Sequence, residues 1–209
     1  VSMGIESVQS VNRLKWQNLK LSMAWKHRNK HGALLTQTAY LTGYSNRFAL
    51  GMSNFQLKLP SSIVDVGYKC VYSKPSWQVG ADLIYHDVQP QSPELSGSYQ
   101  SQTPQEKQQA YETALFADYE HFFSSAYSVK AGVRSTLYHA DGNSHVSMDP
   151  MFSCTYSFPY GGNVTAKIQL QHQYLFRVGF TSLGLPTEFR FASGFGFDPQ
   201  HSCGLSLAY

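Results

Sequence analysis

The chain has 209 residues, a formal net charge of +3, 42% hydrophobic residues and a mean hydropathy of −0.30. This length provides one sizeable core or one run of strands, and no stretch approaches the roughly 18 consecutive apolar residues of a spanning helix, which excludes a helical membrane protein. The 16 basic residues are spread along the chain without a basic block, so the charge pattern does not indicate nucleic-acid binding.

Apolar and polar side chains alternate along most of the chain, which is the pattern of β-strands whose two faces differ. In chain order, the alternation predicts about nine strands, centred near residues 21, 38, 67, 82, 115, 132, 152, 169 and 205. The contrast is sharpest in residues 164–174, where every odd position from Thr165 to Gln173 is polar. We therefore expect an all-β chain forming a single domain over residues 1–209.

The connections between the predicted strands alternate in length. Tight turns are expected near residues 28–32, 73–76, 123–126 and 158–162, and most of them contain Gly, Pro, Ser or Asn. Between them lie long connections at residues 44–62, 88–109 and 177–201, and one of middling length at residues 139–145. Such alternation is typical of tight periplasmic turns and long extracellular loops, so the sequence predicts an antiparallel transmembrane β-barrel segment of about nine to ten strands.

Strand length and aromatic content favour the same interpretation. The alternating segments cover about ten to fourteen residues, whereas strands of soluble sheets usually have about five or six. The chain contains 14 Tyr, 13 Phe and 3 Trp, and aromatic residues near strand ends are expected to form an interfacial girdle. The residues assigned to this girdle are Trp25, Trp77, Tyr85, Tyr138, Phe158 and Tyr174. The alternative is that aromatic residues flank the strands of any sheet.

The cysteines and histidines do not form a metal-binding motif. Cys70, Cys154 and Cys203 are widely spaced without a CxxC pair, so we expect isolated side chains on apolar strand faces. Four of the eight histidines lie near strand ends: His86, His121, His172 and His201. Because no HExxH or HxH spacing is present, we interpret them as lumen or interfacial side chains and predict no metal and no cofactor.

Charged residues on the polar strand faces are expected to pair across neighbouring strands rather than to form catalytic carboxylate pairs. The acidic members are Asp82, Glu112, Asp118 and Glu120, and the basic members are Lys69, Lys130 and Arg134. The glycine-rich residues 193–197 lack a following helix and a Lys, so we interpret them as a loop. The sequence predicts no enzyme; the enzymatic alternative is an outer-membrane phospholipase, which needs a Ser and a His on the lipid-facing rim.

Several segments resemble consecutive hairpins from the barrel of TonB-dependent outer-membrane receptors. The longest are residues 16–48, residues 63–90 with the ending WQVGADLIYHDVQP, and residues 112–138. Similar to later hairpins of that family are the Asp149–Pro150 strand opening, the Gln173–Leu175 strand end, and residues 183–193 followed by residues 198–200. The resemblance covers most of the chain.

The resemblance implies a receptor that imports a nutrient, such as a siderophore or an oligosaccharide, across the outer membrane of a Gram-negative bacterium. It implies a barrel of about 22 strands, a plug domain in the lumen, and a segment that engages the energy-coupling TonB complex. Neither the plug nor that segment is recognisable here, so TonB would be engaged through a part outside this chain. About nine strands would form an arc with two open edges, which lipid does not tolerate. The expected partners are outer-membrane lipid, the TonB complex and a surface lipoprotein, and not nucleic acid.

Ligand contacts of a receptor are expected in the connections at residues 88–109 and 177–201. The first is rich in Gln, Ser and Pro, as in a solvated loop with hydrogen-bonding side chains. The second carries residues suited to stacking on a sugar or an aromatic ligand: Phe180, Phe189, Arg190, Phe191, Phe195 and Phe197. The alternative is that these phenylalanines pack the loop onto itself or onto a neighbour.

Two other classes of protein fit the same pattern. One is a smaller, self-contained outer-membrane barrel that acts as a pore or an adhesion surface. The other is a soluble β-sandwich or lectin-like carbohydrate-binding module, in which the apolar face would be buried and the polar face exposed. A soluble module predicts folding without detergent, whereas both barrels require a membrane or micelle.

Overall fold

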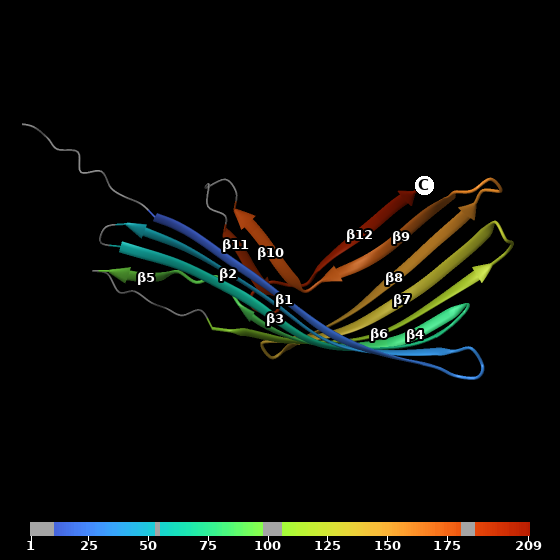
Figure 1. Cartoon of the computed structure of the whole chain (residues 1–209), viewed down its shortest axis with the longest axis horizontal. Coiled ribbons are helices and arrows are strands. Elements are labelled where there is room, and N and C mark those ends of the chain that lie inside the picture. Colours follow the sequence, from blue (N-terminus) through green and yellow to red (C-terminus); the bar gives the residue numbers. More distant parts are fainter. Residues whose placement is uncertain (1–10, 53–54, 98–105, 181–186) are drawn as a thin grey trace, which may run out of the picture.

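In the computed structural model the chain forms one curved antiparallel sheet and a small hairpin (Figure 1). The structure describes residues 11–52, 55–97, 106–180 and 187–209. The main path through the sheet runs β1-β2-β3-β4-β6-β7-β8-β9-β12; β5 pairs with β3, and β10 pairs with β11 in the separate hairpin. The described residues contain no helix, and therefore none long and apolar enough to cross a membrane.

The strands are β1 (Val11–Arg28), β2 (Leu34–Met52), β3 (Phe55–Lys74), β4 (Trp77–Gln89), β5 (Glu94–Gly97), β6 (Gln108–Phe122), β7 (Tyr127–Ala140), β8 (Asn143–Ser157), β9 (Asn163–Gln173), β10 (Leu175–Phe180), β11 (Thr187–Ala192) and β12 (Gln200–Ala208). Each predicted strand centre lies inside one of the nine strands of the main path, so the all-β antiparallel prediction is confirmed. Strands β5, β10 and β11 were not predicted. Strand β5 lies within the predicted connection at residues 88–109, and β11 lies within the one at residues 177–201; β10 begins two residues before the latter.

The predicted tight turns are confirmed, but the strict alternation of short and long connections is wrong at two places. Residues 44–52 and 55–62 of the predicted loop are strand, because β2 and β3 pair from Leu34 opposite Ser73 to Met52 opposite Phe55. Residues 139–145 are not a loop of middling length either. Strands β7 and β8 are joined by Asp141 and Gly142 alone, whose φ angles of 50° and 73° are those of a type I′ turn.

One face of the sheet, the outer face, is apolar and exposed. Side chains at paired positions lie on the same face, and those at alternate positions along a strand do too. The register therefore places on this face the apolar residues at positions 19–25 of β1, 64–72 of β3, 79–85 of β4, 146–156 of β8 and 164–170 of β9 that alternate with polar ones. Many are largely exposed, such as Met23 (75%), Val146 (76%) and Leu205 (82%). The three free cysteines lie on this face, as predicted.

The other face is concave, and the β10–β11 hairpin lies against it (Figure 1). Small buried clusters join the hairpin to the sheet: Ile63 and Val88 pack with Ala192, and Ala110 packs with Tyr138. Phe195 packs against both clusters, so the segment that follows β11 covers the middle of β3 and the adjoining ends of β4, β6 and β7. The main core of the described chain is therefore the contact between hairpin and sheet.

The sheet is open, because its edge strands β1 and β12 do not pair with each other. All residues of β1, and all but one of β12, are exposed. Strands β1 to β3 are 18, 19 and 20 residues long, which exceeds the predicted span length. Strand β8 begins at Asn143 and not at the Asp149–Pro150 opening that the resemblance implies.

Candidate functional site

The concave face carries a connected set of charged side chains centred on Arg134 of β7. One guanidinium nitrogen lies 2.8 Å from Glu112 of β6, and the other lies 3.6 Å from Asp82 of β4. The predicted pairing of opposite charges across neighbouring strands is therefore confirmed for Arg134 and Glu112, whereas Asp82 lies one strand further away, on β4. Because both carboxylates are largely buried, Arg134 compensates charges that would otherwise be costly to remove from water.

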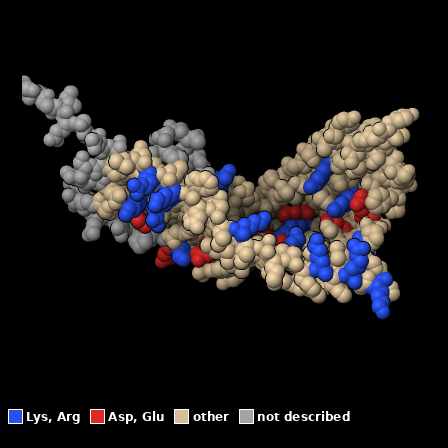
Figure 2. All heavy atoms as spheres, viewed as in Figure 1, with Lys and Arg blue, Asp and Glu red and all other residues tan. Residues whose placement is uncertain are grey.

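His86 of β4 extends this set toward β2 and β3. Its Nδ1 lies 2.8 Å from Asp65, and its Nε2 lies 3.8 Å from Glu112. Asp65 also accepts a hydrogen bond of 3.0 Å from the Thr42 hydroxyl. Residues of five successive strands thus form one polar path on the concave face, and Figure 2 shows acidic and basic side chains gathered where the sheet bends. His86 is buried within this path.

A second polar group lies on the same face toward the tight-turn ends of the strands. Asp118 of β6 accepts a hydrogen bond of 2.5 Å from Gln78 Nε2 and lies 3.7 Å from Lys130 Nζ. The Lys69 ammonium lies 5.1 Å from the centre of the Phe116 ring. Within the described residues, neither Lys69 nor Glu120 forms the ion pair that was expected of it.

Glycines on the concave face make room for these side chains, and sequence reasoning did not identify this role. A Cβ atom at Gly67 would collide with the Tyr40 ring, and one at Gly132 would collide with the Asp118 carboxylate. Each glycine is the cross-strand partner of its bulky or charged neighbour. The available signal was a Gly at a polar-face position inside a strand pattern, which marks a close approach of another group.

A polar hollow of about 450 Å³ opens on the concave face beside β8 and β9. The β8–β9 pairing ends at Met151 opposite Gln169, and Pro150, which lacks an N–H to donate, lies directly beyond. Beyond this point β8 and β9 are joined by a side-chain contact in place of backbone pairing: the Asp149 carboxylate lies 2.5 Å from His172 Nδ1. Glutamine, carboxylate and hydroxyl groups line the hollow, so it suits a ligand that is held by hydrogen bonds.

The six predicted girdle aromatics do not share one face. Trp25, Trp77 and Tyr85 lie on the outer face, and Phe158 lies in the β8–β9 turn with 40% exposure. The girdle prediction is wrong for Tyr138 and Tyr174. Their exposures are 0% and 6%, and their rings stack with centres 4.4 Å apart beneath the hairpin. Both are core residues of the hairpin contact because β7 ends on the concave side with Tyr138 facing inward.

The buried tyrosines also anchor the hairpin by hydrogen bonds. The Tyr138 hydroxyl donates to the Ser193 carbonyl at 3.2 Å, and the Tyr174 and Ser147 hydroxyls share a bond of 2.5 Å. Burial raises the pKa of the Tyr174 hydroxyl above its ordinary value, so this group stays protonated. The Ala192 N–H donates to the Gln108 side chain at 2.8 Å. These bonds fix the base of the hairpin on the sheet.

The residues predicted to contact a ligand are divided by the structure. Phe180 and Phe189 belong to β10 and β11, but their side chains lie outside the described part of the chain. Phe191 packs 4.6 Å from Phe197 (ring centres), and Phe195 packs into the hairpin core. Arg190 lies over the Tyr44 ring of β2 at 3.7 Å. The hairpin therefore uses part of its aromatic surface for its own packing.

The described residues include no group of three or more His, Cys, Asp or Glu side chains placed to hold a metal ion. One histidine contacts a serine: His139 Nδ1 lies 2.9 Å from Ser144 Oγ beside the β7–β8 turn. In the part of the chain described, His139 has no carboxylate partner to orient it as a base. Comparison with protein-family models, curated proteins and solved structures finds no match to this chain.

Proposed function

We propose that this chain forms part of the wall of an outer-membrane β-barrel, and that the barrel is a TonB-dependent receptor that imports a solute. The outer face is the observation that supports a membrane wall most strongly. Its exposed large apolar side chains lie on eight of the nine strands of the main path, all except β2. Soluble monomers rarely expose a contiguous apolar patch of more than a few hundred Å². If lipid covers the outer face, these apolar side chains are not exposed to water.

The dimensions of the outer face agree with this proposal. On β6, Tyr111 and Tyr119 enclose the apolar stretch around Leu115. Their separation of eight residues corresponds to about 27 Å along the strand, or roughly 21 Å across a bilayer at the usual strand tilt. The apolar band of an outer-membrane barrel is about 25 Å tall. Tyrosines at both ends of the stretch suit the two interfaces.

The polar concave face is suited to line the lumen of an importer. Its charged side chains and its polar hollow would line the lumen, and the ion pairs would offset the cost of burying the charges. The hairpin lies on this face at the end of the sheet where the two long connections emerge, which is where an external solute would first meet the lumen. The edges β1 and β12 need further strands to complete a wall. The receptor assignment itself rests on the sequence resemblance.

Fluorescence quenching by brominated lipid tests the membrane wall. Single-tryptophan variants that retain Trp77 on the outer face, or Trp16 on the opposite face of β1, are folded into vesicles of brominated and ordinary phosphatidylcholine. We expect strong quenching of Trp77 and weak quenching of Trp16. A folded β-sheet whose Trp77 is not quenched would refute the proposal.

Uptake measurements distinguish an energised receptor from a passive pore. Cells that produce the receptor are offered labelled siderophores and oligosaccharides, with and without a protonophore. Import that stops with the protonophore supports the TonB-dependent receptor, whereas import that continues supports a pore. Replacing Ser144 with Ala should change neither import nor lipid release; loss of lipid release would instead favour a phospholipase that uses the Ser144–His139 contact.

A further inference from the structure

A basic patch lies on the outer face beside the apolar side chains of β1 to β3. It consists of Arg13 and Lys15 on β1, Arg47 on β2 and Lys58 on β3. The register places Lys15 directly opposite Arg47, and the alternation of side chains puts all four residues on this face. Figure 2 shows Lys and Arg side chains gathered at the end of the sheet where β1 begins.

The basic patch has little negative charge within the described part of the chain. Like charges directly opposite each other on neighbouring strands destabilise a sheet, and Lys15 and Arg47 are such a pair. None of the four residues forms an ion pair with a described residue. The nearest acidic group in the register is Glu94 of β5, opposite Lys58. An anion bound at the patch would relieve this repulsion.

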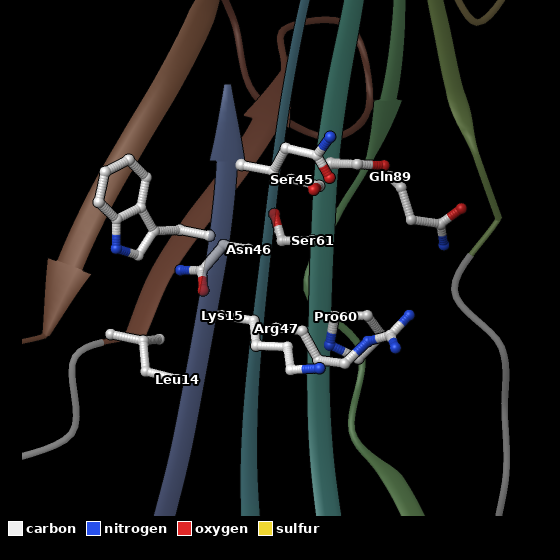
Figure 3. A pocket seen from close by; sticks show the side chains of 11 residues that line it. Leu14, Lys15, Ser45, Asn46, Arg47, Pro60, Ser61 and Gln89 are labelled. Atoms are coloured by element: carbon white, nitrogen blue, oxygen red, sulfur yellow. The ribbon is translucent and has the colours of Figure 1, made fainter. Parts of the chain in front are cut away.

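A hollow of about 630 Å³ lies at the patch (Figure 3). On the outer face it is lined by Lys15, Gln17, Ser45, Arg47, Pro60 and Ser62, together with Gln89 of β4. Figure 3 shows the Lys15 and Arg47 side chains next to each other on neighbouring strands. Two cations with amide and hydroxyl groups around them match the chemistry of a phosphate group that carries polar substituents.

The position of the patch decides the source of that phosphate. Lys15 precedes Leu19, where the continuous apolar run of the β1 outer face begins, by four residues, which corresponds to about 13 Å along the strand. If the apolar side chains lie in hydrocarbon, the basic patch lies at the level of lipid headgroups. We infer that the basic patch binds the phosphate groups of membrane-lipid headgroups in the leaflet around the long-connection end of the sheet. The inference rests on the proposed function, because it requires the outer face to lie in lipid.

Partitioning of the intact chain between vesicles of two compositions tests this inference. The affinity for phosphatidylcholine vesicles containing phosphatidic acid is compared with the affinity for phosphatidylcholine alone, by flotation at low ionic strength. Each basic residue near an anionic surface contributes about 1 kcal/mol, or about fivefold in affinity. The variant Lys15→Gln/Arg47→Gln should therefore lose about thirtyfold of the preference for acidic vesicles, and high salt should remove most of it.

A matched control removes the same charge from the opposite face. Lys20 and Lys26 alternate with the apolar residues of β1 and lie on the concave face, so Lys20→Gln/Lys26→Gln should keep the preference. An equal loss in both variants would overturn the inference, as would an equal affinity of the unmodified chain for both vesicles. Failure to enter either vesicle would instead refute the proposed function. Inorganic phosphate that abolishes the preference at low concentration would assign the patch to a soluble anion and overturn the lipid assignment.

Discussion

A charge placed in the middle of the outer face distinguishes lipid from water as its neighbour. Leu115 lies between Tyr111 and Tyr119 on β6, four residues from each, and is 64% exposed. In a bilayer, Leu115→Arg at this central depth should cost about 2–4 kcal/mol. In water, an exposed substitution away from any special feature should cost no more than about 0.5 kcal/mol. The two environments therefore predict results that differ by about a hundredfold in the unfolding equilibrium.

The measurement is denaturant unfolding of the chain folded into phosphatidylcholine vesicles, followed by circular dichroism. The control variant Gln171→Arg places the same charge at an exposed position of the concave face, beside Asp149, and should cost less than about 1 kcal/mol. A folded Leu115→Arg variant that is as stable in vesicles as the unmodified chain would contradict the assignment of the outer face to lipid. A loss of stability in Gln171→Arg equal to that in Leu115→Arg would contradict the same assignment.

Three further changes test the concave face, again by denaturant unfolding. Gly67→Ala should cost about 1–3 kcal/mol, because its Cβ would displace the Tyr40 ring. Arg134→Gln should cost about 1–3 kcal/mol, because it leaves two largely buried carboxylates without their cation. Tyr174→Phe should cost about 0.5–1.5 kcal/mol through loss of its bond to Ser147. Burial raises the pKa of the Tyr174 hydroxyl above its ordinary value of 10.0. The stability that this hydroxyl contributes is therefore fully present below pH 10.0 and is lost as the pH rises through the higher pKa of the folded state. The difference in unfolding free energy between the unmodified chain and Tyr174→Phe should shrink over that alkaline range.

Each change has a control. Gly204→Ala meets its nearest neighbour only at 3.5 Å and should be tolerated; a loss equal to that of Gly67→Ala would contradict the steric argument. Lys107→Gln removes an exposed ion pair with Asp87 and should cost less than about 1 kcal/mol. An equal effect of Lys107→Gln and Arg134→Gln would contradict the role of burial. Unchanged amide exchange of β10 and β11 in Tyr174→Phe would show that this hydroxyl does not anchor the hairpin.

The strands of the main path were predictable because their two faces differ in polarity. Residues 164–171 alternate strictly, and β9 occupies residues 163–173. The extensions of β2 and β3 were not predictable by the same reasoning, since Ser45, Asn46 and Pro60 have the composition of a loop. Their strand conformation is set by pairing along the whole register, which is a property of two segments together. The Asp141–Gly142 turn, in contrast, was marked in the sequence by its Asp-Gly pair.

The site was predictable in kind but not in detail. The residues on the polar face indicated ion pairs, and only the register selects Glu112 and Asp82 as the partners of Arg134. The inward position of Tyr138 could not be inferred, because an aromatic residue at a strand end suits an interface or a core equally well. The hairpin decides between them by covering the end of β7. The basic patch was missed because its members are far apart in sequence and meet only through pairing.

Partitioning of the chain between plain buffer and detergent micelles, with circular dichroism of the folded fraction, tests the central claim most directly. A chain whose apolar outer face lies in lipid should show β-structure only in micelles or vesicles and should aggregate in buffer. A soluble, folded monomer in plain buffer would contradict the membrane wall and favour a soluble carbohydrate-binding module.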